Sequence, residues 1–157
     1  MELEDQIQIA APRDVVYAAL NDTAVLQRCI PGCEEITRNS ETELTARVSL
    51  KIGPVKARFN GQVTLDAERA PDGFSLQGAG DGGVAGFAKG GADVVLEENA
   101  DGTLLRYTAK AEIGGKIAQL GSRLVLGTAK KLSRSFFDNF EQVMRGEAAE
   151  DTSPKPG

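Results

Sequence analysis

The 157-residue chain contains no histidine and no tryptophan, and it has only two cysteines. Histidine is the usual acid–base group near neutral pH, the usual nitrogen ligand of zinc and the usual activator of a serine or cysteine nucleophile. Any catalysis would therefore depend on carboxylates, lysines or tyrosines. Cys29 and Cys33 have three residues between them, a spacing that matches neither a redox Cys-x-x-Cys pair nor half of a four-ligand zinc site. We expect reduced thiols, no metal site and no cofactor.

Long apolar runs are also missing, and the chain does not start like a secretory signal. No stretch approaches the roughly 20 apolar residues of a membrane-spanning helix. The first residues are acidic and alternate polar with apolar, whereas a signal peptide starts basic and becomes continuously apolar. We expect a cytoplasmic protein. The net charge of −5 argues against nucleic-acid binding, which depends on neutralising phosphates.

The hydrophobic periodicity predicts one strand, two short helices, six more strands and a long closing helix. Period-two alternation predicts strands within residues 3–9, 35–38, 43–52, 55–66, 74–78, 88–96 and 105–113. From Ile117 to Val143, apolar residues recur every three or four positions, which indicates one amphipathic helix. This order is that of the START-like helix-grip fold, of class α+β, in which a curved antiparallel sheet wraps around a C-terminal helix. We predict one domain over 1–146 and a disordered polar tail over 147–157.

Eleven positions on the inward side of the predicted sheet are glycine or alanine. A sheet packs about 10 Å from the layer opposite, a gap that such small side chains do not fill. Bulky Phe136, Phe137 and Phe140 occur only in the second half of the helix. We predict a cavity beneath the first half; the alternative is that the glycines curve the sheet onto the helix without a void. The residues expected to line the cavity are Leu20, Ala46, Val48, Phe59, Gly61, Leu76, Gly78, Ala88, Tyr107, Ala109, Ala111, Ile117, Leu120, Gly121 and Leu124.

The remaining motifs and charged residues give no evidence of a nucleotide site or an active site. Residues 78–83 fit the letters of the dinucleotide motif G-x-G-x-x-G, but a strand pattern follows instead of a helix, so we interpret them as a hairpin. The carboxylates in strand patterns, Asp66, Glu68, Asp93 and Glu112, fall on the outward face, and we assign no catalytic residue. The cations Lys116, Arg123, Lys130 and Arg134 form one stripe of the predicted helix. This stripe is either a solvated face or a docking surface for an acidic partner or anionic lipid.

Three sequence blocks resemble the G-subunit family of carbon monoxide dehydrogenase, which is part of the SRPBCC superfamily. They are residues 29–34, 51–61 and 115–124, with Phe136 and Phe137 downstream. The resemblance implies a non-catalytic accessory protein of an aerobic molybdenum-containing dehydrogenase, linked to membrane recruitment, with a cavity for a quinone or lipid. Some relatives end in a hydrophobic anchor, but this chain ends in polar residues, so we expect any membrane contact to be peripheral, at the inner face. The rival hypothesis is a polyketide-cyclase-like enzyme, which would need an acid–base group inside the cavity.

Overall fold

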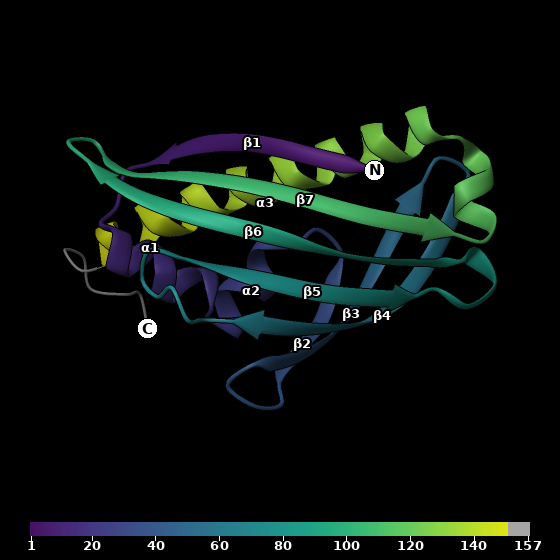
Figure 1. Cartoon of the computed structure of the whole chain (residues 1–157), viewed down its shortest axis with the longest axis horizontal. Helices are drawn as coiled ribbons and strands as arrows, with labels where there is room; N and C mark the ends of the chain where they lie inside the picture. Colours follow the sequence, from purple (N-terminus) through teal and green to yellow (C-terminus); the bar gives the residue numbers. More distant parts are fainter. Residues whose placement is uncertain (151–157) are drawn as a thin grey trace.

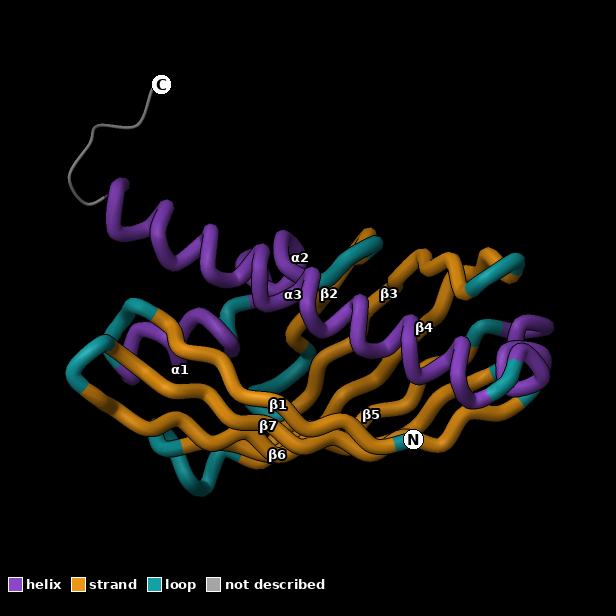
Figure 2. The backbone as a smooth tube through the Cα atoms, turned by 90° about the horizontal axis from the view of Figure 1, so that it is seen from above, coloured by secondary structure: helices purple, strands orange, loops and turns teal. Residues whose placement is uncertain are grey.

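The computed structural model shows a curved antiparallel sheet with a long C-terminal helix lying along one of its faces (Figures 1 and 2). It describes residues 1–150, with side chains through residue 146. The strands are β1 (Glu2–Ile9), β2 (Cys33–Arg38), β3 (Glu43–Ile52), β4 (Val55–Asp66), β5 (Gly73–Asp81), β6 (Phe87–Asn99) and β7 (Gly102–Gly114). The helices are α1 (Arg13–Leu20), α2 (Thr23–Cys29) and α3 (Ser122–Glu150), with the short 3-10 helices η1 (Gly83–Ala85) and η2 (Lys116–Leu120).

The seven strands form one sheet in the order β1-β7-β6-β5-β4-β3-β2, and all neighbours are antiparallel. Strands β2 to β7 follow one another as a meander, and β1 returns to pair with β7. The sheet bends toward α3, which crosses it (Figure 2). This arrangement confirms the predicted α+β helix-grip fold.

Two separate clusters of buried side chains lie toward opposite ends of α3. The larger joins α1 and α2 to the second half of α3 and includes Val16, Leu105 and Phe140. The smaller joins the β3–β4 hairpin to η1 and η2 and includes Phe59 and Ile117. The sheet between them carries the small residues noted in the sequence. Packing is therefore dense toward the two ends of the sheet and thin between them.

The predicted closing helix starts later than the periodicity indicates. Gly115 and Gly121 have φ values of 79° and 96°, in the region that side-chain-bearing residues avoid, and they bound η2. The apolar spacing over 116–120 is therefore that of a 3-10 turn, and α3 begins at Ser122. No helix in the described part of the chain is long and apolar enough to cross a membrane. The predicted tail spans residues 147–157. The helix α3 extends to Glu150, and residues 151–157 lie outside the described residues.

Candidate ligand cavity

A cavity of about 630 Å³ lies between the inner face of the sheet and the first half of α3. This volume falls within the roughly 300–1,000 Å³ typical of small-molecule sites. The helix contributes Val125, Leu132 and Phe136, with the smaller Thr128 and Ala129 between them. The sheet contributes residues from β3 to β7.

The floor of the cavity is two neighbouring rows of small residues that cross the sheet. The strand registers align Ala46, Gly61, Gly80 and Ala88 in one row and Gly78, Gly90 and Ala111 in the next. Because strands lie about 4.8 Å apart, side chains at such aligned positions normally cover the sheet. Here the backbone is left almost bare over adjacent strands, and this produces the cavity.

The glycines of this floor are there for different reasons. A Cβ atom on Gly80 would meet no described atom within 4 Å, and one on Gly61 would make only ordinary contacts, the nearest at 3.6 Å. A Cβ on Gly90 would lie 2.0 Å from the carbonyl oxygen of Lys110, so the β6–β7 pairing requires glycine at this position. Curvature and close approach thus account for Gly90, whereas Gly80 leaves open space.

Ten of the fifteen residues predicted to line the cavity do line it. They are Ala46, Val48, Phe59, Gly61, Leu76, Gly78, Ala88, Ala109, Ala111 and Ile117. Nine of them lie on strands, where the alternation of faces can be read directly from the sequence. The tenth, Ile117, lies on η2 and closes the end of the cavity as part of the smaller core cluster.

The other five predicted residues lie elsewhere, so their predicted placement is wrong. Leu20 and Tyr107 pack in or against the larger core, where the Tyr107 ring stacks on Phe137 at 5.4 Å. Leu120 packs against the smaller cluster, and Gly121 and Leu124 are exposed. The break before α3 turns the helix so that Val125, and not Leu124, faces the sheet. Periodicity alone locates neither that break nor the ends of the cavity.

Several lining residues are absent from the sequence-based prediction. Leu132 and Phe136 belong to the apolar stripe of the helix, so the same 3.6-residue period could have found them. Leu50, Ile52 and Val63 share the inward face of β3 and β4, and the alternation there could have found them too. Ile30 and Pro31, which follow α2, gave no such signal, because only the tertiary fold brings that turn to the cavity.

The cavity wall offers little acid–base chemistry. Among the described lining residues there is no aspartate, glutamate or tyrosine, and the polar side chains besides two lysines are Gln62, Thr128 and Ser133. The Thr128 hydroxyl donates to the Leu124 carbonyl of its own helix at 2.9 Å. The two lysines, Lys89 and Lys110, are largely exposed and form ion pairs with Glu112 and Glu2, respectively. Such a wall holds a ligand by burying apolar surface.

None of the four carboxylates expected to face outward lines the cavity. Asp93 bonds to Arg69 and Ser75, and Glu112 pairs with Lys89 at 3.5 Å. Asp66 is exposed at the end of β4, and Glu68 lies in the following turn instead of a strand. These carboxylates therefore do not converge on one site.

Both cysteine thiols are free, and burial raises the pKa of each. Cys29 is fully buried in the larger core, and Cys33 is half-buried at the start of β2. A raised pKa keeps a thiol protonated and unreactive at neutral pH. Within the described residues, no group of three or more histidine, cysteine or acidic side chains is placed to hold a metal ion.

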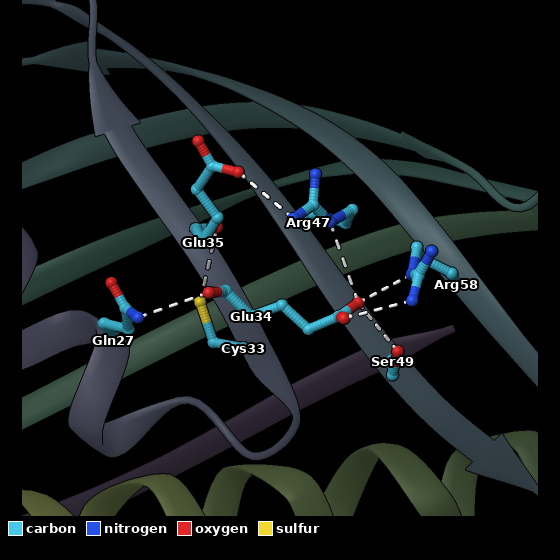
Figure 3. A network of polar contacts seen from close by, with 7 residues as sticks. All are labelled: Gln27, Cys33, Glu34, Glu35, Arg47, Ser49 and Arg58. Atoms are coloured by element: carbon cyan, nitrogen blue, oxygen red, sulfur yellow. Dashed lines mark hydrogen bonds and ion pairs between the residues drawn. The ribbon is translucent and has the colours of Figure 1, made fainter.

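A polar network fixes the edge strand β2 to its neighbours, away from the cavity (Figure 3). The Glu34 carboxylate accepts hydrogen bonds from the Ser49 hydroxyl at 2.9 Å and from Arg58 at 2.7 and 3.1 Å. The hydrogen bonds from Ser49 and Arg58, followed by the charges of Arg58 and Arg47, lower the pKa of Glu34. Because Glu34 sits at an irregularity in the β2–β3 pairing, the network replaces contacts that the ladder lacks there.

The cationic stripe is divided by the structure. Arg123, Lys130 and Arg134 lie along one exposed side of α3, but Lys116 lies on η2. Within the described residues none of these four cations forms an ion pair, since the observed pairs involve other lysines and arginines. Their docking role stays a prediction.

A second space of about 480 Å³ lies between the end of β7 and the start of α3. It shares Met1, Ala111, Ile113 and Val125 with the cavity, so the two spaces adjoin. Ser122 and Arg123 of α3 also line this space.

Solved structures share the whole architecture. A conserved protein from Geobacillus kaustophilus is 28% identical, with a TM-score of 0.86 over 93% of this chain and 96% of that one. The Zhui aromatase/cyclase from Streptomyces sp. R1128 is 14% identical, with a TM-score of 0.68 over 100% and 98%. Ara h 8.0201 is 13% identical, with a TM-score of 0.64 over 93% and 98%. A comparison with curated protein sequences gives no match.

A curved sheet closed by a helix over a cavity defines a START-like, or Bet v 1-like, helix-grip protein. The family model for the G subunit of carbon monoxide dehydrogenase (CoxG) matches residues 6–145. The chain belongs to this family, which confirms the resemblance found in the sequence.

Proposed function

We propose that this protein is a non-catalytic accessory protein that binds an apolar molecule, a quinone or a lipid tail, in the cavity beneath α3. The observation that carries the proposal is the floor of glycine and alanine, which leaves open space at Gly80 in an otherwise folded core. Burying apolar surface contributes roughly 25 cal/mol per Å², so a tail that buries about 300 Å² gains about 7 kcal/mol. That gain offsets the cost of association without any charged anchor.

The proposed partner is an aerobic molybdenum-containing carbon monoxide dehydrogenase or a related hydroxylase. The family name supports a role beside such an enzyme. The exposed cations Lys116, Arg123, Lys130 and Arg134 are the proposed contact with an acidic face of it. Pull-down of the dehydrogenase by wild-type protein and by a charge-reversed variant, across a salt series, tests this contact.

The second candidate function is a polyketide-cyclase-like enzyme that acts on an apolar substrate in the same cavity. It is favoured by the shared fold with an aromatase/cyclase. It needs an acid–base group in the cavity. Lys89 and Lys110 are exposed at its wall and each pairs with a carboxylate, which leaves Gln62, Thr128 and Ser133 as the other polar candidates. Neutral amide and hydroxyl groups are weak proton-transfer agents at pH 7, so binding is the better supported function.

The decisive experiment fills the cavity from its floor with Gly80→Leu. A Cβ at Gly80 meets no described atom within 4 Å, so leucine can project into the cavity without displacing backbone. We expect at least about tenfold weaker binding of a fluorescent fatty-acid analogue, with an unchanged circular dichroism spectrum. The matched control is Gln77→Leu, on the outward face of the same strand, which should bind as wild type does. Equal binding by Gly80→Leu and wild type would contradict the proposal.

A further inference from the structure

We propose that the Ser133 hydroxyl determines which apolar molecules the cavity prefers, by donating a hydrogen bond to a carbonyl oxygen of the ligand. The inference rests on the proposed ligand-binding function and adds the chemistry of recognition within that site. Ser133 lies in the middle of α3 and is half-buried in the cavity wall. The preferred ligand is then an apolar chain or ring system that carries a carbonyl group at one end.

Three of the other polar residues of the described wall do not turn their side chains into the cavity. Gln62 lies between Gly61 and Val63, which face inward on β4, so the exposed Gln62 side chain lies on the outer face of the sheet. Lys89 and Lys110 likewise lie between inward neighbours of β6 and β7 and are exposed. The polar side chains that remain for the interior of the cavity both belong to α3.

The two hydroxyls of α3 in the cavity wall differ in their hydrogen bonding. The Thr128 hydroxyl donates to the Leu124 carbonyl, one turn earlier in its own helix, at 2.9 Å. The Ser133 hydroxyl has the equivalent carbonyl of Ala129 one turn earlier, yet within the described residues it forms no hydrogen bond. The Thr128 proton is therefore already used, whereas the Ser133 proton is available to a ligand.

The Ser133 oxygen also keeps contact with open space. Within the described part of the chain, the fully enclosed side-chain polar atoms without a hydrogen bond belong to Arg13 and Arg47. Ser133 is flanked in the wall by the apolar Leu132 and Phe136. A hydroxyl in such a wall is more stable when a partner accepts its proton, because an unpaired donor loses the hydrogen bond it makes in water.

The packing of α3 on β7 indicates what lies opposite Ser133. Phe137, one turn later on the same side of the helix, stacks on Tyr107 at 5.4 Å. The first turns of α3 line a space with Ala111, farther along β7. The helix therefore runs opposite to β7, and Ser133 lies at the level of Ala109, which is between these two positions on the inward face.

The space at this level has a floor of small residues. Ala109 is directly opposite Ala92 in the β6–β7 register, and both line the cavity. From Ser133 back to Val125 the helix extends about 12 Å, at about 1.5 Å per residue, and Ile117 closes the cavity beyond. A ligand with its carbonyl oxygen at Ser133 would extend its apolar part along this wall.

A carbonyl group fits this position better than a charged group or a second hydroxyl does. A carbonyl oxygen accepts the serine proton and has no proton of its own that needs a partner. A charged group would need an opposite charge, and the two lysines of the described wall lie on the outer face. The ring carbonyl of a quinone and the acyl carbonyl of a lipid ester share this chemistry.

The test compares three probes in the full chain: decylubiquinone, methyl dodecanoate and dodecane, which has no carbonyl group. Each displaces the fluorescent fatty-acid analogue, whose own Kd is first measured for every variant. Ser133→Ala should weaken one or both carbonyl probes by about three- to tenfold, the value of one neutral hydrogen bond. Its affinity for dodecane should stay within about twofold of wild type, since alanine keeps the wall apolar. Ser133→Thr, which retains the hydroxyl, should restore carbonyl binding. Loss for decylubiquinone alone assigns the ring carbonyl, and loss for the ester alone assigns the acyl carbonyl.

The matched control is Ser135→Ala. Ser135 is also half-buried on α3 and forms no hydrogen bond within the described residues, but it does not line the cavity. This variant should bind all three probes as wild type does. An equal loss for dodecane and the carbonyl probes, no loss in Ser133→Ala, or the same loss in Ser135→Ala would overturn the inference and leave ligand binding intact. Failure of wild type to bind any probe would instead overturn the proposed function and this inference together.

Discussion

At the scale of single residues, glycines that look alike in the sequence have different roles. Gly80 and Gly90 both lie on the inward side of the sheet, and the sequence pattern indicates open space at both. Only the pairing of strands reveals the difference. A Cβ atom on Gly90 would lie 2.0 Å from a carbonyl oxygen, whereas a Cβ atom on Gly80 would project into open space. Sequence alone could predict that the residues of the cavity floor are small, because the period-two alternation of a strand fixes the face on which each residue lies. It could not predict which glycine is replaceable.

This difference predicts opposite effects of alanine at the two positions. Gly80→Ala should be neutral or stabilise the protein by up to about 1 kcal/mol, because alanine restricts the unfolded chain and its methyl group fits. Gly90→Ala should destabilise it by about 2–4 kcal/mol, because the β6–β7 pairing must open to admit the methyl group. Urea unfolding of both variants measures the free energies. Equal values would mean that the sheet relaxes freely at Gly90.

At the scale of elements, the start of α3 shows where periodicity fails. The apolar spacing of α3 continues backward through Thr128 and Leu124 to Leu120 in η2, so the pattern is typical of one uninterrupted helix. The positive φ angles at Gly115 and Gly121 interrupt it, and spacing carries no information about φ. For this reason the spacing wrongly predicts Leu124 and Gly121 in the cavity. The strands are predicted well because each has a single inward face.

The same element predicts a contrast between two exposed glycines. Gly121→Ala should destabilise the protein by about 1–2 kcal/mol, because φ is 96° there although no described atom would touch the methyl group. Gly127→Ala, inside α3 with equally open surroundings, should stabilise it by about 0.5–1 kcal/mol. Thermal unfolding of the two variants gives the comparison. A stabilising Gly121→Ala would show that this junction is not held in its observed conformation.

The edge strand β2 predicts a pH dependence. Hydrogen bonds from Ser49 and Arg58 lower the pKa of Glu34 below its usual value of 4.5 in the folded protein. Its contribution to stability is therefore present above pH 4.5 and is lost as the pH falls through the lower, folded-state pKa. Glu34→Gln should lose less stability than wild type over that range. Parallel acid-unfolding profiles for the two proteins would contradict this role of Glu34.

At the scale of the whole molecule, the ends of the cavity are set by topology. The local patterns of Leu20 and Tyr107 match those of true lining residues, but α1 and the start of β7 lie at the densely packed end. Which part of the sheet is densely packed and which part is hollow depends on where α1 and α2 dock, and this is a property of the complete fold.

This division into a packed end and a hollow middle predicts unequal costs for two phenylalanines of α3. Phe140 is fully buried in the larger core, so Phe140→Ala should destabilise the protein by about 3–5 kcal/mol. Phe136 is half-buried and lines the cavity, so Phe136→Ala should cost clearly less and should leave a larger binding space. Urea unfolding with and without the fatty-acid analogue measures both effects, because a ligand that binds only the folded state adds to the free energy of unfolding. Equal costs for the two variants would mean that α3 packs against the sheet as tightly at Phe136 as at Phe140.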